Sequence, residues 1–166
     1  MSESVALPVI GHARTPWRRR EDAPHQPSAA PDALGSIVVA PPYRAALADL
    51  DSCARIWVLF VFDRSRGWAP TVKPPRGGPK RGVLATRAPN RPAPIGLTCV
   101  ALLRVDLAAG ELHVRGLDLL DQTPVLDIKP YLPFVDAFPD AGHGWLEPYL
   151  RAGIEPRLKK QYREPK

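Results

Sequence analysis

Proline recurs along the whole 166-residue chain and constrains the fold more than any other feature. The 21 prolines are more than twice the ~5% usual in proteins. Because proline removes a backbone donor and clashes with the preceding helical turn, long helices are not expected. Short strands joined by proline-bearing loops are favoured instead. A hydrophobic content of 45% is enough for one domain with a real core.

The apolar runs predict six or seven strands and one or two short helices. Residues 56–62 are all apolar with high β propensity, which predicts a strand covered on both faces. Residues 97–107 and 111–117 predict a hairpin whose second arm has Leu112 and Val114 on one face and polar neighbours on the other. Further strands are expected to end near Arg14 and to cover 37–40, 82–86 and 125–128, with helices at 41–50 and within 148–166.

This pattern indicates a mainly β protein, a small single-domain barrel or sandwich over residues 1–140, followed by a short tail over 141–166. A Rossmann-type enzyme should show a glycine-rich turn after an early strand, yet Gly35 and Gly67 stand alone. No stretch approaches the ~18 apolar residues of a membrane span, and the N-terminus lacks a signal-peptide pattern. Cys53 and Cys99 favour reduced thiols in a cytoplasmic protein, and the scattered histidines argue against a metal site.

Positive charge is concentrated in one segment, between Arg64 and Arg91. This segment has eight Lys or Arg, no Asp or Glu, four glycines and five prolines, whereas the net charge of the whole chain is only +6. Such a segment cannot be a central strand or a regular helix. It predicts a shaped loop that meets an anionic partner, and nucleic acid is the first candidate. Trp68, inside it, either stacks on a base or packs the loop onto the barrel.

Two short polar stretches lie at the end of this segment and beyond it. In residues 86–96, Arg87 and Arg91 lie among three prolines, either as a rigid clamp for a carboxylate or phosphate or as a solvated connector. In residues 116–133, Asp118 follows a strand, where it can accept from ribose hydroxyls or an amino group. A turn role is favoured for Asp121. We hypothesise from position that the catalytic residues are Asp127, Lys129 and Tyr131.

Three motifs in this order resemble those of the TrmO family of tRNA methyltransferases, also called TsaA-like or VirR-like: GWAPTVKPPRGG, GVLATRAPNRPAPIG and GLDLLDQTPVLDIKPYLP. The resemblance runs from about Ile10 to Pro133. It implies a β-barrel that binds S-adenosylmethionine without a Rossmann fold and pairs as a homodimer. It further implies methyl transfer to N6 of threonylcarbamoyladenosine beside the tRNA anticodon. Well-known members continue with a second domain, so this chain resembles the compact single-domain members.

The resemblance also implies which residues contact the cofactor. His25 stands where the family more often has Arg, and Asp63-Arg64 where many members have His-Gln. The implied cofactor residues are Pro24, His25, Gln26, Asp63, Arg64, Arg87, Leu97, Gly116, Leu117, Asp118 and Leu119. For tRNA phosphates, the basic residues expected to bind are Lys73, Arg76, Lys80, Arg81 and Arg91.

Two other functions stay open at this point. One is a non-catalytic RNA-binding or regulatory barrel that keeps the cofactor site. The other is a methyltransferase that acts on a different small substrate.

Overall fold

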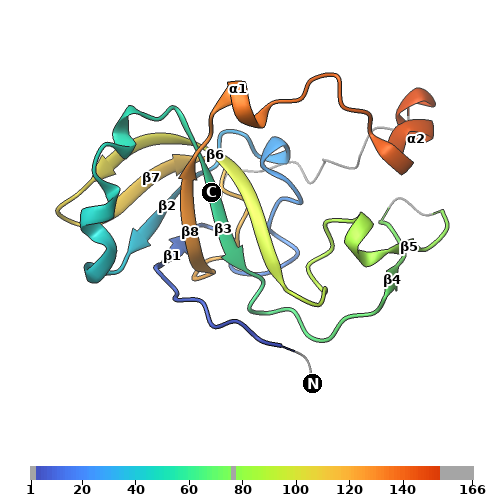
Figure 1. The fold of residues 1–166 in the computed structure, drawn as a ribbon, viewed down its shortest axis with the longest axis horizontal. Helices are drawn as coiled ribbons and strands as arrows, with labels where there is room; N and C mark the ends of the chain where they lie inside the picture. The colour runs from blue at the N-terminus through green and yellow to red at the C-terminus, as the bar shows by residue number, and fades with distance from the viewer. Residues whose placement is uncertain (1–2, 76–77, 154–166) are drawn as a thin grey trace.

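The computed structural model describes residues 3–75 and 78–153, and its centre is a closed six-stranded barrel (Figure 1). Neighbouring strands are antiparallel all the way round, in the order β1-β2-β7-β6-β3-β8. The prediction of a small, mainly β barrel is therefore confirmed. The strands are β1 (Gly11–Arg14), β2 (Leu34–Val39), β3 (Arg55–Val61), β6 (Ile95–Asp106), β7 (Glu111–Arg115) and β8 (Pro124–Pro130).

The core fills the barrel with side chains from alternate strand positions. On β7, Leu112 and Val114 are fully buried while their neighbours are not, as the alternation in the sequence predicts. The predicted hairpin forms between β6 and β7, and its turn uses Gly110 at φ 69°. The most deeply buried branched side chains are Ile37, Val39, Ile56, Val58, Val100 and Val125.

Two predicted elements differ from the observed ones. The segment expected as a helix at 41–50 forms the 3-10 turns η2 (Pro41–Leu47) and η3 (Leu50–Ser52), because Asp49 between them adopts φ 65°. The strand expected at 82–86 is reduced to β5 (Arg81–Gly82), and the 3-10 turn η4 (Val83–Ala85) follows it.

Strand β3 is also less covered than its sequence predicts. Its inward residues Ile56, Val58 and Phe60 are buried, but Trp57, Leu59 and Val61 on the outer face are only half-buried. The expectation of two covered faces is therefore wrong, because the segment at Tyr131 and Asp136, which contacts Trp57, covers this face only in part. Trp57, which the apolar run would place in the core, lies on this outer face.

A basic arm, residues 64–91, extends away from the barrel (Figure 1). It contains a two-stranded sheet of β4 (Thr71–Val72) and β5, followed by η4. The chain after the barrel passes through α1 (Pro133–Asp136), and then η5 (Gly144–Leu146) and α2 (Glu147–Arg151) lie beside the arm. A short 3-10 turn, η1 (Pro27–Ala29), lies in the loop between β1 and β2.

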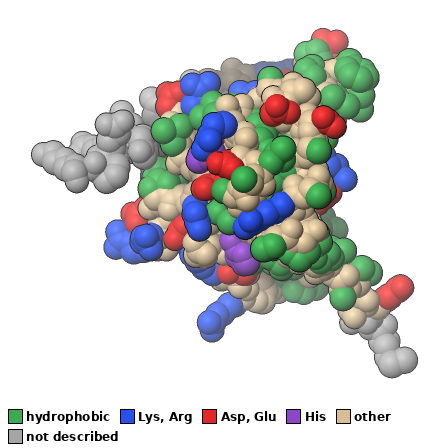
Figure 2. Space-filling model, turned by 90° about the vertical axis from the view of Figure 1, so that its left-hand side faces the viewer, with side chains coloured by type: hydrophobic (Ala, Val, Ile, Leu, Met, Phe, Trp, Pro, Cys, Tyr) green, Lys and Arg blue, Asp and Glu red, His purple; other side chains and the backbone are tan. Residues whose placement is uncertain are grey.

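The end of the barrel away from the arm has no uniform charge. Figure 2 shows basic and acidic side chains interspersed over this face. Arg14 pairs with Glu111, Arg104 with Asp106, and Arg115 with Asp32, at 3.6–3.9 Å. Because these arginines have acidic partners, the arm remains the better candidate for meeting an anionic partner.

Candidate active site

A cavity of about 730 Å³ lies where the barrel meets the root of the basic arm. Its walls come from the loop at 20–27, the end of β3 with the following 62–65, the arm end at 87–91, the start of β6, and residues 118–120. Trp57, Ile95 and Leu97 provide apolar surface, and Arg20, Arg64, Arg87 and Arg91 provide positive charge. Its volume is in the range typical of sites for small molecules and cofactors.

The cavity brings together nearly all the residues that the family resemblance implies for the cofactor. Nine of them line it, from five separate stretches of the chain: Pro24, His25, Gln26, Asp63, Arg64, Arg87, Leu97, Asp118 and Leu119. Gly116 and Leu117 lie behind the wall. Leu117 is buried in the barrel core, and Gly116 adopts φ 85°, a conformation that glycine permits without strain.

A hydrogen bond joins the basic arm to the loop between β1 and β2 at one side of the cavity. Arg87 Nη1 donates to Gln26 Oε1 at 2.9 Å, and both side chains line the cavity. Gln26 also donates from Nε2 to the carbonyl of His25 at 2.6 Å. The guanidinium is thereby oriented by a neutral amide and not by a carboxylate. Its positive charge remains available to an anionic group of a ligand.

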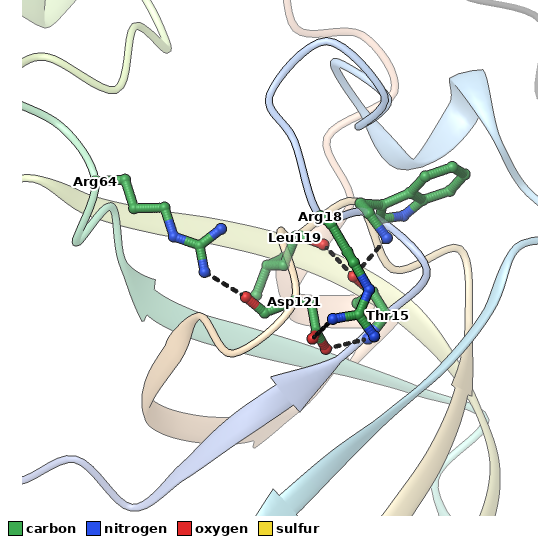
Figure 3. Close-up of polar contacts among 6 residues, drawn as sticks. Thr15, Arg18, Arg64, Leu119 and Asp121 are labelled. Atoms are coloured by element: carbon green, nitrogen blue, oxygen red, sulfur yellow. Dashed lines mark hydrogen bonds and ion pairs between the residues drawn. The ribbon is translucent and has the colours of Figure 1, made fainter.

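Asp121 is the centre of a hydrogen-bond network that fixes the rim of the cavity (Figure 3). Its carboxylate accepts from the backbone N–H of Thr15 at 3.1 Å and pairs with Arg18 at 3.6 Å. Arg64 donates to its carbonyl at 2.6 Å, and Thr15 Oγ1 donates to the carbonyl of Leu119. Asp121 does stand in a turn, but its carboxylate binds a segment more than 100 residues away in sequence. Sequence reasoning missed that role.

Asp118 and Thr98 place two buried oxygens in the wall of the cavity. Burial raises the pKa of Asp118 to about 6, and the neighbouring Thr98 hydroxyl and the Arg87 charge act in the opposite direction. Among the described residues, neither Asp118 Oδ1 nor Thr98 Oγ1 has a partner in good hydrogen-bond geometry, although the two groups lie close enough for Thr98 to lower the Asp118 pKa. Unpartnered buried polar atoms are rare in folded proteins, so these two point to a bound ligand. Thr98 was not predicted, although its position on the inward side of a strand was a usable signal.

The three residues hypothesised as catalytic lie outside the cavity lining, on and after β8. Asp127 and Lys129 pair with each other at 2.8 Å on the outer face of the strand. Tyr131 packs edge-to-face against Trp57, which does line the cavity, with ring centroids 5.5 Å apart. Their catalytic role stays a prediction.

The basic residues expected to bind nucleic acid occupy different environments. Lys73 and Lys80 are exposed on the arm, and Arg76 lies outside the described residues. Arg91 lines the cavity and donates to the carbonyl of Thr86 at 3.1 Å. Arg81 is half-buried against Trp145. Trp68 is 56% exposed, so it does not pack the arm onto the barrel.

Two kinds of feature are absent from the described residues, 3–75 and 78–153. No group of three or more His, Cys, Asp or Glu side chains there is arranged to hold a metal ion. None of the helices in the same ranges has the length and apolar character needed to cross a membrane.

Comparison with known proteins identifies the barrel. The family model of the tRNA-methyltransferase O N-terminal domain matches residues 12–137, which include all six barrel strands apart from Gly11 at the start of β1. The chain belongs to the TrmO N-terminal domain family. The solved structure of TrmO from Pseudomonas aeruginosa superposes with a TM-score of 0.71 at 37% sequence identity, covering 86% of this chain and 63% of that one.

Two curated relatives of this TrmO-family chain differ in length. The tRNA (adenine(37)-N6)-methyltransferase of Escherichia coli K12 is 41% identical over 152 residues, covering 87% of this chain and 65% of the relative. An S-adenosyl-L-methionine-binding protein of Archaeoglobus fulgidus is 38% identical over 132 residues, covering 80% of this chain and 93% of the relative. The chain thus spans about two thirds of the first relative and nearly all of the second.

Proposed function

We propose that this protein is an S-adenosylmethionine-dependent methyltransferase that modifies N6 of an adenosine in tRNA. The observation that carries the proposal is the cavity, which gathers Arg87, Asp118 and the other implied cofactor residues from distant parts of the chain. Two relatives support the proposal. The Escherichia coli relative is a tRNA (adenine(37)-N6)-methyltransferase, and the Archaeoglobus fulgidus relative is an S-adenosyl-L-methionine-binding protein.

The residues of the cavity fit this cofactor chemically. S-adenosylmethionine carries a carboxylate, an ammonium, a sulfonium and an adenine, so its site needs both charge signs and apolar surface. Arg87 can hold the carboxylate, and Asp118, with its unpartnered buried oxygen, can accept from a donor group. Trp57, Ile95 and Leu97 offer surface for the adenine or the thioether.

The chemistry requires positioning more than covalent assistance. When bound, the cofactor supplies a methyl group activated by a positively charged sulfur. The residues of this chain would hold the target amine against that methyl group and would accept the one proton that the amine releases. The cavity walls align the donor with the incoming amine. Asp127 and Tyr131 are the proposed groups that orient the amine or accept its proton.

The proposed target is the threonylcarbamoyladenosine beside the tRNA anticodon, as the family resemblance implies. Lys73 and Lys80, exposed on the basic arm, are suited to phosphates of the anticodon stem. The alternative of a non-catalytic RNA-binding barrel predicts cofactor binding without turnover. Mass spectrometry of tRNA nucleosides from a deletion strain distinguishes the two functions. The methyltransferase predicts loss of N6-methyl-threonylcarbamoyladenosine, and an unchanged amount of this nucleoside contradicts the proposed target.

We further propose that the protein is a cytoplasmic homodimer. An exposed apolar cluster on and beside α1 supports a contact between copies, because Phe134 is 87% exposed and Phe138 is 75% exposed. Light scattering after size-exclusion chromatography tests the oligomeric state. A dimer that becomes a monomer in Phe134→Ser plus Phe138→Ser supports this surface, and a wild-type monomer contradicts the proposal.

Calorimetric titration with S-adenosylmethionine tests the cofactor site directly. Arg87→Gln removes a charge-assisted contact, so we expect about a tenfold or greater loss of affinity. Arg115→Gln is the matched control, since Arg115 lies on β7 outside the cavity lining and pairs with Asp32. Equal affinity in both variants would remove Arg87 from the site. No binding to the wild type would contradict the proposed function itself.

A further inference from the structure

Trp68 is an aromatic side chain on the basic arm that is exposed and makes no ring contact with any other described residue. It is 56% exposed, whereas Trp17 is buried in a small core and Trp145 packs against Tyr149. Tryptophan is a well-buried side chain on average. A single exposed apolar side chain is nevertheless common on protein surfaces. The position of this indole therefore matters more than its exposure.

The backbone that carries the indole is tied to the returning limb of the arm at both ends. Asn90 Nδ2 donates to the carbonyl of Arg66 at 3.0 Å, and the backbone N–H of Val83 donates to the carbonyl of Pro70 at 3.0 Å. Between these two bonds the chain turns at Gly67, whose φ of 64° costs glycine no strain. The ring is thus presented from a held backbone, which lowers the entropy lost on binding a partner.

The arm that carries Trp68 has positive charge and no acidic side chain. Residues 64–91 contain no Asp or Glu. Arg66 and Lys73 are exposed, and neither has an acidic partner in the part of the chain that the structure describes. Single-stranded nucleic acid is held by this combination, because each base can stack on a ring and each phosphate can meet a cation.

The indole also lies close to the cavity along the chain. Ser65 lines the cavity, and Trp68 follows it by three residues. Because an extended chain spans at most ~3.6 Å per residue, the two Cα atoms are within about 11 Å of each other. Asn90, which holds the backbone at Arg66, belongs to the stretch 87–91 that forms another cavity wall. A strand with one nucleotide at the cavity therefore brings the next nucleotide to the indole.

We propose that Trp68 is a stacking platform for the unpaired base next to the target nucleotide in tRNA, and that Arg66 binds a phosphate of the same strand. The proposal rests on the proposed function, to which it adds a nucleotide-binding subsite on the arm. An indole can stack on any base, so this subsite positions the strand without reading its sequence. Since Trp68 is not part of the cavity lining, it contributes to RNA binding and not to cofactor binding.

Three variants and an anticodon stem-loop RNA test the stacking platform. Trp68→Ala should raise the Kd for the RNA about fivefold or more, and Trp68→Phe, which keeps a smaller ring, should fall between. Leu84→Ala is the matched control, because Leu84 is 74% exposed on the same arm and has no ring. It should bind the RNA within about twofold of wild type. Calorimetry with S-adenosylmethionine should give the same cofactor affinity for all three variants.

Two further measurements separate stacking from charge. Trp68→Ala should leave the salt dependence of the RNA affinity unchanged, whereas Arg66→Gln should reduce the slope of log Kd against log salt by about 0.7. A fluorescent purine analogue is placed in the RNA on either side of the target adenosine. Stacking on the indole should quench its emission at one of these positions with wild type, and Trp68→Ala should not quench it there.

Four results would overturn the proposal. They are equal RNA affinity in Trp68→Ala and wild type, an equal loss in Leu84→Ala, quenching that Trp68→Ala retains, and a parallel loss of cofactor affinity, which would show that Trp68 stabilises the domain. If Trp68 instead contacts a second copy of the chain, Trp68→Ala changes the mass measured by light scattering and leaves RNA affinity unchanged. Failure of the wild type to bind the RNA contradicts the proposed function instead.

Discussion

The guanidinium of Arg81 lies over the ring of Trp145, with 5.2 Å between its carbon and the ring centroid. This contact joins the basic arm to the chain that follows the barrel. Trp145 also donates from Nε1 to the carbonyl of Ala85 at 2.8 Å, and its ring meets Tyr149 edge-on. Two of these interactions hold the arm against η5, about 60 residues later in the sequence, and the third joins η5 to α2.

Loss of the Trp145 ring should weaken tRNA binding without affecting the cofactor. An exposed cation–π contact contributes about 0.5–1 kcal/mol, so Trp145→Ala should raise the Kd for tRNA by about two- to fivefold. Trp145→Phe keeps the ring and loses only the bond to Ala85, so it should fall between. Filter binding of tRNA and calorimetry with S-adenosylmethionine give the two affinities. An equal loss of both would show that the contact stabilises the whole domain and not the arm.

The stability of the ligand-free protein should depend on pH through Asp118. Its folded-state pKa of about 6 lies above the ordinary 3.8, so the folded state binds the proton more tightly than the unfolded state. The free energy of unfolding should therefore decrease as pH rises from about 4 to about 6 and be unaffected by this group above that range. At ~1.4 kcal/mol per pKa unit, the decrease is at most about 3 kcal/mol.

Asp118→Asn isolates this effect from other titrating groups. Urea denaturation of both proteins at several pH values should show the variant gaining on the wild type between pH 4 and 6. A difference that does not change with pH would contradict the assignment. If a cationic group binds here, cofactor affinity in the wild type should fall as pH drops below about 6, and this dependence should vanish in the variant.

Close packing of Gly96 against Phe60 should make this glycine sensitive to substitution. A Cβ at Gly96 would lie 2.2 Å from Phe60 Cζ, and Phe60 lines the cavity. Gly96→Ala should destabilise the protein by about 1–3 kcal/mol and weaken cofactor binding. Gly82→Ala is the matched control, since no atom lies within 4 Å of its Cβ position and its φ is −52°. Equal melting temperatures for the two variants would refute the packing argument.

Catalysis by the residues on β8 is tested in single-turnover methylation. Asp127→Asn and Tyr131→Phe should each slow the step by about 10²-fold or more if they orient the amine or take its proton. Cofactor affinity should stay unchanged, because neither residue lines the cavity. Unchanged rates in both variants would exclude the role. A loss in Lys129→Gln alone would assign the role to the Lys129 ammonium itself, because Asp127→Asn also breaks their ion pair.

Local patterns in the sequence predicted most of the barrel. The alternation at Leu112 and Val114 specified a strand and its buried face, and the turn at Gly110 specified the hairpin. Prediction failed at 41–50 and 82–86, where the apolar spacing suited a helix or strand. In the structure, a positive φ at Asp49 interrupts the first segment, and most of the second forms the 3-10 turn η4. Nor could the sequence show that the side chains on the outer face of β3 are only half-buried, since their burial depends on which distant segments pack against them.

The sequence alone determined the class of fold and, through three motifs, the family. The family resemblance also supplied nine of the residues that line the cavity, and Arg87, Asp118 and Leu119 among them lie within the quoted motifs. Only the tertiary structure decided that Gln26 meets Arg87, that Asp121 fastens the first loop, and that Thr98 and Asp118 share one buried wall. The physical reason is that strand alternation and turn preferences act over a few residues. These partners, from 20 to 106 positions apart, are brought together by barrel closure, which no local pattern in the sequence can show.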